Sequence, residues 1–186
     1  HAQDLNNRDI DVAFTSDALE DIDAFDHLDL IQESYVVATP KSVTTRVRDL
    51  KTLSKAQPFL GYSGRTQSGQ RIERHLRRLR LDIQRGNAFE SSSDLVAAIS
   101  HGYGWSILTP SQLFDPLEAG AEIAIHEMPA PGLSRTLGLV WRKREMPDAM
   151  KELTDVCRTV LQDECLPRLR KLAPDLVPHF RILDAP

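Results

Sequence analysis

The residues best placed to bind a small ligand are the serines at positions 91–93, which precede an apolar segment. Their hydroxyls can accept hydrogen bonds from the free N–H groups of a helix start, and Asp94 places a negative charge where the helix dipole favours one. The sequence therefore predicts a helix that begins here and ends at Gly102, a residue that readily adopts positive φ. Such a helix start can hold a small anion or a carboxylate, although serines at this place can equally serve as helix caps alone.

Further polar groups follow other predicted strands. Thr15 comes directly after a strand predicted at residues 9–14, with apolar side chains at positions 10, 12 and 14 and largely buried from Ile10 onward. A polar loop over residues 63–69 follows another predicted strand, at residues 58–62. Ligands gather at the carboxyl ends of strands in open α/β sheets, so these groups are candidate contacts. Within the loop, Arg65 beside Thr66 suits a carboxylate, because a guanidinium can donate two parallel hydrogen bonds to it. The alternative for each of these residues is an ordinary surface loop or a helix cap.

The remaining chemistry-bearing residues do not form a catalytic or metal-binding pattern. The histidines are scattered, without His-Glu-x-x-His spacing, and the sequence has no Gly-x-Ser-x-Gly elbow. The acidic run over residues 17–29 lacks the spacing of a calcium loop, so we expect a solvated loop there. The loop at residues 63–69 lacks the Gly-Lys-Ser/Thr ending of a phosphate-binding loop. We therefore expect no enzyme activity, no metal ion and no cofactor.

The composition is that of an ordinary globular protein. The chain has 186 residues, of which 41% are hydrophobic and 27% are charged, and its net charge is -4. The sequence predicts an amphipathic helix from Gln70 to Leu81. A mildly acidic chain is a poor candidate for holding nucleic-acid phosphates by itself, so we interpret the arginines within residues 71–80 as a solvated face of this helix. No apolar run is long enough to cross a bilayer.

Two cysteines, Cys157 and Cys165, lie in a helix predicted from Asp148 to about Leu166, which Pro167 is expected to stop or kink. Their spacing of eight residues corresponds to a rise of about 12 Å, which is too far for a disulfide. We interpret them as packed thiols in a reducing compartment, and expect a cytoplasmic protein without membrane contact.

The order of the predicted elements indicates an α/β protein with two lobes. Helices separate the strands and hairpin signals are few, so a mostly parallel sheet is expected. Changes in composition near residues 40 and 133 divide the chain into lobe I, residues 1–39 and 134–186, and an inserted lobe II, residues 40–133. A small molecule would fit a cleft between two such lobes.

Four segments, taken in order, resemble the effector-sensing domain of LysR-type transcriptional regulators. They are Asp-Ile-Asp-Val-Ala-Phe at 9–14, Glu-Ser-Tyr-Val-Val-Ala-Thr-Pro at 33–40, the serine-capped helix and Gly-Tyr-Gly turn at 90–110, and Leu-Gly-Leu-Val-Trp-Arg at 137–142. The resemblance implies a two-lobed fold akin to type 2 periplasmic binding proteins, with a small effector in the cleft, and the chemistry of Arg65 and Thr66 adds the expectation that this effector is acidic. Compared with that pattern, the DNA-binding helices, the linker helix and the first two βα units of lobe I do not appear before His1, so part of lobe I is expected to be missing from this chain.

The resemblance also implies where the effector binds. Lobe II contributes the end of one strand and the polar start of the serine-capped helix, and lobe I contributes the end of its first strand and part of the returning strand. Arg65 and Thr66 are added on their local chemistry. The expected effector-binding residues are Thr15, Gly61, Tyr62, Ser63, Arg65, Thr66, Ser91, Ser92, Leu137 and Leu139.

The function that the resemblance implies is ligand sensing without chemistry. An effector would change the balance between open and closed lobes, and a homodimer or homotetramer would pass that change to DNA-binding domains that are absent from this chain. A solute-binding protein of a transport system shares the fold and is the main alternative. An enzyme built on the same lobes is a third, and it would require a paired acid and base in the cleft.

Overall fold

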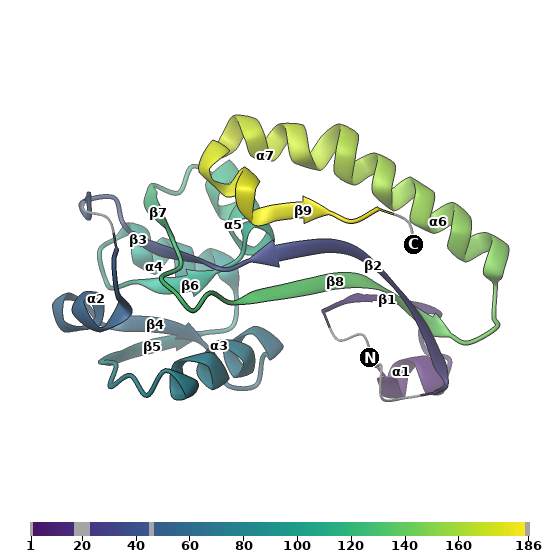
Figure 1. Ribbon diagram of the computed structural model, residues 1–186, viewed down its shortest axis with the longest axis horizontal. Coiled ribbons are helices and arrows are strands. Elements are labelled where there is room, and N and C mark those ends of the chain that lie inside the picture. Colours follow the sequence, from purple (N-terminus) through teal and green to yellow (C-terminus); the bar gives the residue numbers. More distant parts are fainter. Residues whose placement is uncertain (1, 17–22, 45–46, 185–186) are drawn as a thin grey trace. The chain divides into compact units, whose positions relative to one another are not determined.

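The computed structural model describes residues 2–16, 23–44 and 47–184, and they form two compact units. Unit 1 consists of His1–Glu33 and Ser134–Pro186, and unit 2 consists of Ser34–Leu133. The chain therefore passes from unit 1 to unit 2 at residues 33–34 and returns at residues 133–134. Figure 1 labels the helices and strands of both units.

A four-stranded sheet with the order β1-β8-β2-β9 forms the centre of unit 1. β1 pairs antiparallel with β8, which places Thr15 opposite Gly138, and β9 pairs antiparallel with β2. Buried apolar side chains of β2, β8 and helix α6, among them Leu30 and Met150, form one core cluster. The strands of this sheet are β1 (Val12–Thr15), β2 (Phe25–Ser34), β8 (Ser134–Arg142) and β9 (Phe180–Ile182).

The helices of unit 1 are α1 (Ala2–Asn6), α6 (Pro147–Val160) and α7 (Leu166–Leu172). A π-helical turn, Leu161–Cys165, joins α6 to α7, and Figure 1 shows them as one long helical segment. We expected Pro167 to stop or kink this helix. It is accommodated because it lies in the first turn of α7, where a missing backbone N–H removes no bond of that helix. A 3₁₀ turn, Pro174–His179, then leads to β9.

Strand β2 begins inside the acidic segment that we expected to be a solvated loop. Residues 17–22 of that segment lie outside the described residues, but the strand starts at Phe25 and continues to Ser34. In β1, the alternation of the strand turns Ala13 and Thr15 inward and leaves Phe14 52% exposed. The expectation of a buried apolar run through Phe14 is therefore wrong.

Unit 2 contains a three-stranded sheet, β6-β3-β7, and a separate two-stranded sheet, β4-β5. β3 (Val36–Pro40) pairs antiparallel with both β6 (Ser106–Leu108) and β7 (Ile123–Glu127). β4 (Phe59–Tyr62) and β5 (Arg85–Phe89) are paired in parallel.

The expectation of a mostly parallel sheet is wrong, because antiparallel pairing prevails among the described strand pairs. The helices do separate strands, as predicted, but they do not make neighbouring strands parallel. For example, helix α5 (Pro110–Glu118) connects β6 to β7. These two strands lie on either side of β3, and each is antiparallel to it.

The helices of unit 2 are α2 (Leu50–Ala56), α3 (Gln67–Arg78), α4 (Ser92–Ser100) and α5 (Pro110–Glu118). The core centres on Trp105, which is fully buried and meets the Phe59 ring edge-to-face with 4.9 Å between ring centroids. Buried residues of α3, including Ile72 and Leu76, belong to the same cluster. Helix α3 starts three residues before the expected Gln70, so part of the predicted polar loop is its first turn.

Candidate ligand-binding site

The carboxyl ends of β4 and β5 lie at one edge of unit 2, because the two strands are parallel and Tyr62 pairs with Phe89. The backbone N–H of Ser63 donates to the carbonyl oxygen of Phe89 over 2.8 Å, which holds the two strand ends together. Helix α3 follows β4 and helix α4 follows β5. Two helix N-termini therefore start from the same edge, which is the arrangement in which α/β sheets commonly bind ligands.

The serines at the start of α4 have different partners. Ser91 is the N-cap: its Oγ accepts a hydrogen bond from the backbone N–H of Asp94 over 3.1 Å and donates to the Asp94 carboxylate over 2.7 Å. Ser92 Oγ instead lies 2.7 Å from the hydroxyl of Tyr62. The structure thus brings together Tyr62 and Ser92, two predicted site residues that are 30 positions apart in sequence.

Thr66 forms the corresponding cap of α3. Its hydroxyl accepts a hydrogen bond from the N–H of Gly69 over 3.0 Å and donates to the carbonyl oxygen of Ser63 over 2.9 Å. Gly69 allows this tight turn, because a Cβ at that position would lie 2.3 Å from the Ser63 oxygen. The Thr66 side chain is therefore part of the frame that positions Ser63 at the edge of the sheet.

Arg65 is exposed and forms an ion pair with Glu90. Its Nη2 lies 2.6 Å from Glu90 Oε1, and the two side chains are 86% and 66% exposed. Ion pairs between exposed side chains contribute about 0–1 kcal/mol, so a ligand carboxylate could replace Glu90 as the partner of this guanidinium at little cost. The pair links the loop after β4 to the segment after β5.

A cavity of about 340 Å³ adjoins this edge and is lined by two of the predicted residues, Gly61 and Tyr62. Tyr62 thus lines the cavity and also contacts the start of α4 through its hydroxyl. The sequence analysis missed the other polar lining residues, because they carry no motif of their own. They are Glu73 of α3 and Arg85 and Asn87 of β5.

The missed residues are held in place by a salt bridge and a ring contact. Arg85 Nη1 lies 2.9 Å from Glu73 Oε2, and its guanidinium carbon lies 5.5 Å from the centroid of the Phe59 ring. Several glycines also line the cavity. Their recurrence between residues 61 and 86 was the one sign in the sequence that this part of the chain leaves open space. They are Gly61, Gly64, Gly69 and Gly86.

Unit 1 contains the other three predicted residues, and the structure places them side by side. Thr15 of β1 pairs with Gly138 of β8, so Leu137 and Leu139 flank the position opposite it. Thr15 is 6% exposed and Leu139 is 3% exposed, and the Leu139 side chain belongs to the hydrophobic core of unit 1. A ligand contact from any of the three stays a prediction.

Residues 2–16, 23–44 and 47–184 were also compared with the requirements of a metal site and of a membrane-spanning helix. Within these ranges, no group of three or more His, Cys, Asp or Glu side chains is placed to hold a metal ion. Over the same part of the chain, no helix is both long and apolar enough to span a membrane.

The family model of the LysR substrate binding domain matches residues 1–162 of this chain. No protein of curated function matches it in sequence. Among solved structures, the effector binding domain of QuiR in complex with shikimate is 20% identical with a TM-score of 0.66, over 82% of this chain and 74% of that one.

Two further solved structures are similar. The regulatory domain of MetR, a LysR family regulator from N. meningitidis, is 14% identical with a TM-score of 0.66, over 98% of this chain and 82% of that one. The regulatory domain of CcmR from Synechocystis PCC6803, in complex with 2-PG, is 15% identical with a TM-score of 0.72, over 88% and 79%. At these identities the likeness concerns the fold, and it confirms the expected α/β class of the type 2 periplasmic-binding-protein kind.

Proposed function

The chain belongs to the LysR substrate-binding domain family, and on this premise we propose that it senses a small acidic effector at the edge formed by β4, β5 and the start of α4. The observation that carries this proposal is the 2.7 Å contact between the hydroxyls of Tyr62 and Ser92. It places a pair of hydroxyls, which can reorient to donate to a carboxylate oxygen, at the N-terminus of a nine-residue helix whose dipole favours negative charge.

The other predicted residues fall into three groups in this proposal: ligand contacts in unit 2, helix caps, and residues of unit 1. Ser63 and Arg65 supply a hydroxyl and a guanidinium from the loop after β4, and Gly61 keeps the cavity beside Tyr62 open. Ser91 and Thr66 act mainly as helix caps, because their hydroxyls are already engaged. Thr15, Leu137 and Leu139 are proposed as the contribution of unit 1.

The proposed output is regulation of DNA binding rather than catalysis. An effector that has different affinities for two conformations of the protein shifts their populations, and the chain would transmit that shift to a separate DNA-binding domain. We propose a homodimer or homotetramer in the cytoplasm as the working form. Family membership favours this function over a transport solute-binding protein, which shares the fold.

Ligand binding by the purified chain tests the proposal. Shikimate and 2-PG are the first probes, because relatives of the same fold were solved with them, followed by a panel of other small carboxylates. We expect at least one acid to raise the unfolding temperature of the protein, because a ligand that binds only the folded state stabilises it. Replacing Ser92 with leucine should abolish that shift, because the apolar side chain removes the hydroxyl and fills the space beside Tyr62.

The matched control is Ser111→Leu. Like Ser92, Ser111 lies in the first turn of a helix of unit 2, but it is exposed and belongs to α5 rather than to the proposed site. This variant should keep the ligand-induced shift. A Ser92→Leu protein that folds and responds to the acid like the parent would remove Ser92 and the α4 start from the site.

A further inference from the structure

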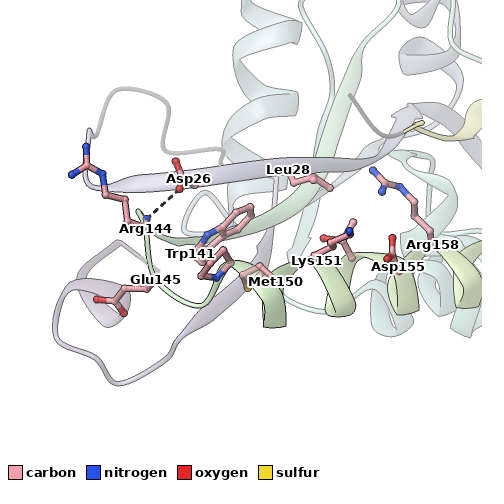
Figure 2. Close-up of a pocket in the computed structure, with 11 residues that line it drawn as sticks. Asp26, Leu28, Trp141, Arg144, Glu145, Met150, Lys151, Asp155 and Arg158 are labelled. Carbon is pink, nitrogen blue, oxygen red and sulfur yellow. Dashed lines mark hydrogen bonds between the residues drawn. The ribbon is translucent and has the colours of Figure 1, made fainter.

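Unit 1 contains a second cavity, of about 350 Å³, between helix α6 and the strands β2 and β8. Its apolar lining comes from Leu28 of β2, Trp141 of β8 and Met150 of α6, all of which belong to or pack against one hydrophobic cluster. Figure 2 shows these side chains between the strand and the helix, with charged residues toward both ends. A cavity of this volume falls in the range that small ligands occupy.

One charged residue of this lining, Arg158 of α6, has buried donors without a partner. Its Nε and Nη2 atoms are inaccessible to solvent and make no hydrogen bond to any of the described residues. In Figure 2 its side chain rises from α6 toward the strands. Leaving these two N–H donors buried is unfavourable, because they have lost their hydration without gaining hydrogen bonds. An anion in the cavity would supply the missing acceptors.

The carboxylates at the other end of the cavity are already engaged. Asp26 accepts a hydrogen bond from the backbone N–H of Arg144, and Glu145 accepts from Arg8 and Arg142. Figure 2 shows the side chains of Arg144 and Glu145 pointing away from the cavity. Neither acid accepts a hydrogen bond from Nε or Nη2 of Arg158.

Asp155 lies one helical turn before Arg158 and also lines the cavity, but no ion pair joins the two within the described part of the chain. The charged lining residues are three bases, Arg144, Lys151 and Arg158, and three acids, Asp26, Glu145 and Asp155, so together they carry no net charge. A ligand with a single carboxylate can pair with Arg158 without placing further negative charge beside Asp155.

We propose that this cavity binds a small monocarboxylate with an apolar body, separately from the effector site of unit 2. The carboxylate pairs with the Nε and Nη2 donors of Arg158, which have the fork geometry for a bidentate contact. The apolar body packs against Trp141, Leu28 and Met150, which removes apolar surface from water on both sides. The cavity would thus provide a second input to the same protein.

Phenylacetate is a suitable probe, because it combines one carboxylate with a flat apolar ring. Binding is measured from tryptophan fluorescence of the full chain. Trp141 lines the cavity, whereas Trp105 is fully buried in unit 2 and provides a constant background. We expect a saturable change with phenylacetate and none with the neutral amide, phenylacetamide. Arg158→Met should weaken phenylacetate binding by roughly tenfold to a hundredfold, because a charge-assisted hydrogen-bonded pair is lost.

Arg170→Met is the control, because Arg170 is an exposed arginine on α7, in the same long helical segment but outside the cavity. This variant should bind like the parent. Without ligand, Arg158→Met should unfold at the same temperature as the parent or higher, because it removes two buried donors that have no partners, so a loss of binding will not reflect misfolding.

Three outcomes would overturn the proposal: equal binding by Arg158→Met, equal binding of phenylacetamide, or no fluorescence change with phenylacetate. The variant Ser92→Leu separates this site from that of unit 2. It should retain phenylacetate binding, so failure of one proposal leaves the other standing.

Discussion

Hydrogen bonding separates the polar residues of the unit 2 edge into helix caps and a pair of hydroxyls that bond to each other. The hydroxyls of Ser91 and Thr66 each accept from a backbone N–H of the helix that they precede. Side chains in this role typically stabilise a protein by about 1 kcal/mol and position the residues beside them. Tyr62 and Ser92 bond to each other instead, so a ligand can enter their hydrogen-bond network without undoing a helix cap.

A buried histidine of α3 gives unit 2 a dependence on pH. Burial and, to a smaller extent, the nearby positive charge of Arg78 lower the pKa of His75 below its ordinary value of 6.5. The folded state therefore favours the neutral ring. As the pH falls through 6.5, the unfolded chain gains a proton that the folded chain resists, so the free energy of unfolding decreases toward the lower, folded pKa.

We therefore expect the protein to be more stable at pH 8 than at pH 5, and His75→Gln to reduce that difference. One histidine contributes at most about 1.4 kcal/mol per pH unit over the window where only the unfolded state is protonated. Urea unfolding at a series of pH values measures the slope. His126, whose pKa is also lowered by burial, keeps part of the dependence in the variant.

His101→Gln is the control for this experiment, because His101 is exposed at the end of α4. It should leave the slope between pH 8 and pH 5 close to that of the parent. A His75→Gln protein with an unchanged slope would show that another group is responsible.

At the scale of elements, the sequence predicted those whose signals are local. The serine-capped helix was expected to end at Gly102, and α4 covers Ser92–Ser100 with Ser91 as its cap. The capping hydroxyls, the glycine turn and the apolar spacing all lie within a few residues of one another. The strand that becomes β4 was likewise recognisable from its own residues.

Elements that depend on distant partners were missed. β9 forms only because Phe180–Ile182 pairs with β2, some 150 positions earlier, and the sequence of this short segment contains no sign of that partner. The hydrophobic periodicity of a strand does not show in which direction its neighbour runs, and for this reason the expectation of a mostly parallel sheet is wrong. In the site, Arg85 and Asn87 were overlooked for the same reason, because only the pairing of β5 with β4 places them at the cavity.

Strands β2 and β8 approach each other closely at Gly138. A Cβ at this position would lie 2.2 Å from the carbonyl oxygen of Leu28 and 2.9 Å from the Cα of Asp29, both of which are backbone atoms of β2. Because backbone atoms in a paired strand cannot move independently, the sheet itself would have to shift. We expect Gly138→Ala to lower the free energy of unfolding by roughly 1–3 kcal/mol or more.

Gly132→Ala is the matched control, because a Cβ there would have no atom within 4 Å. It should change the free energy of unfolding by less than about 0.5 kcal/mol. Urea denaturation of both variants and of the parent measures these changes in the free energy of unfolding. Equal stability of Gly138→Ala and Gly132→Ala would mean that the two strands are less closely apposed than the structure shows.

For the whole molecule, the important feature is that each unit has a hydrophobic core of its own. Leu76, 1% exposed, belongs to the cluster around Trp105 in unit 2, and Leu30, fully buried, belongs to the cluster of β2, β8 and α6 in unit 1. Truncating a buried leucine to alanine typically costs 2–5 kcal/mol, of order a third of the stability of an ordinary domain. Leu76→Ala and Leu30→Ala therefore each test whether the loss of stability is confined to the unit that contains the substitution.

We expect Leu76→Ala to accelerate hydrogen exchange of backbone amides mainly in unit 2, and Leu30→Ala to do so mainly in unit 1. The reason is that packing is lost in one core only, so the free energy of local opening falls most in the unit that contains it. Exchange followed by mass spectrometry assigns protection to peptides of His1–Glu33 and Ser134–Pro186, or of Ser34–Leu133. The two variants are each other's control. If both accelerated exchange equally throughout the chain, the units would open as one cooperative body, and an effector bound to unit 2 would stabilise unit 1 to the same extent.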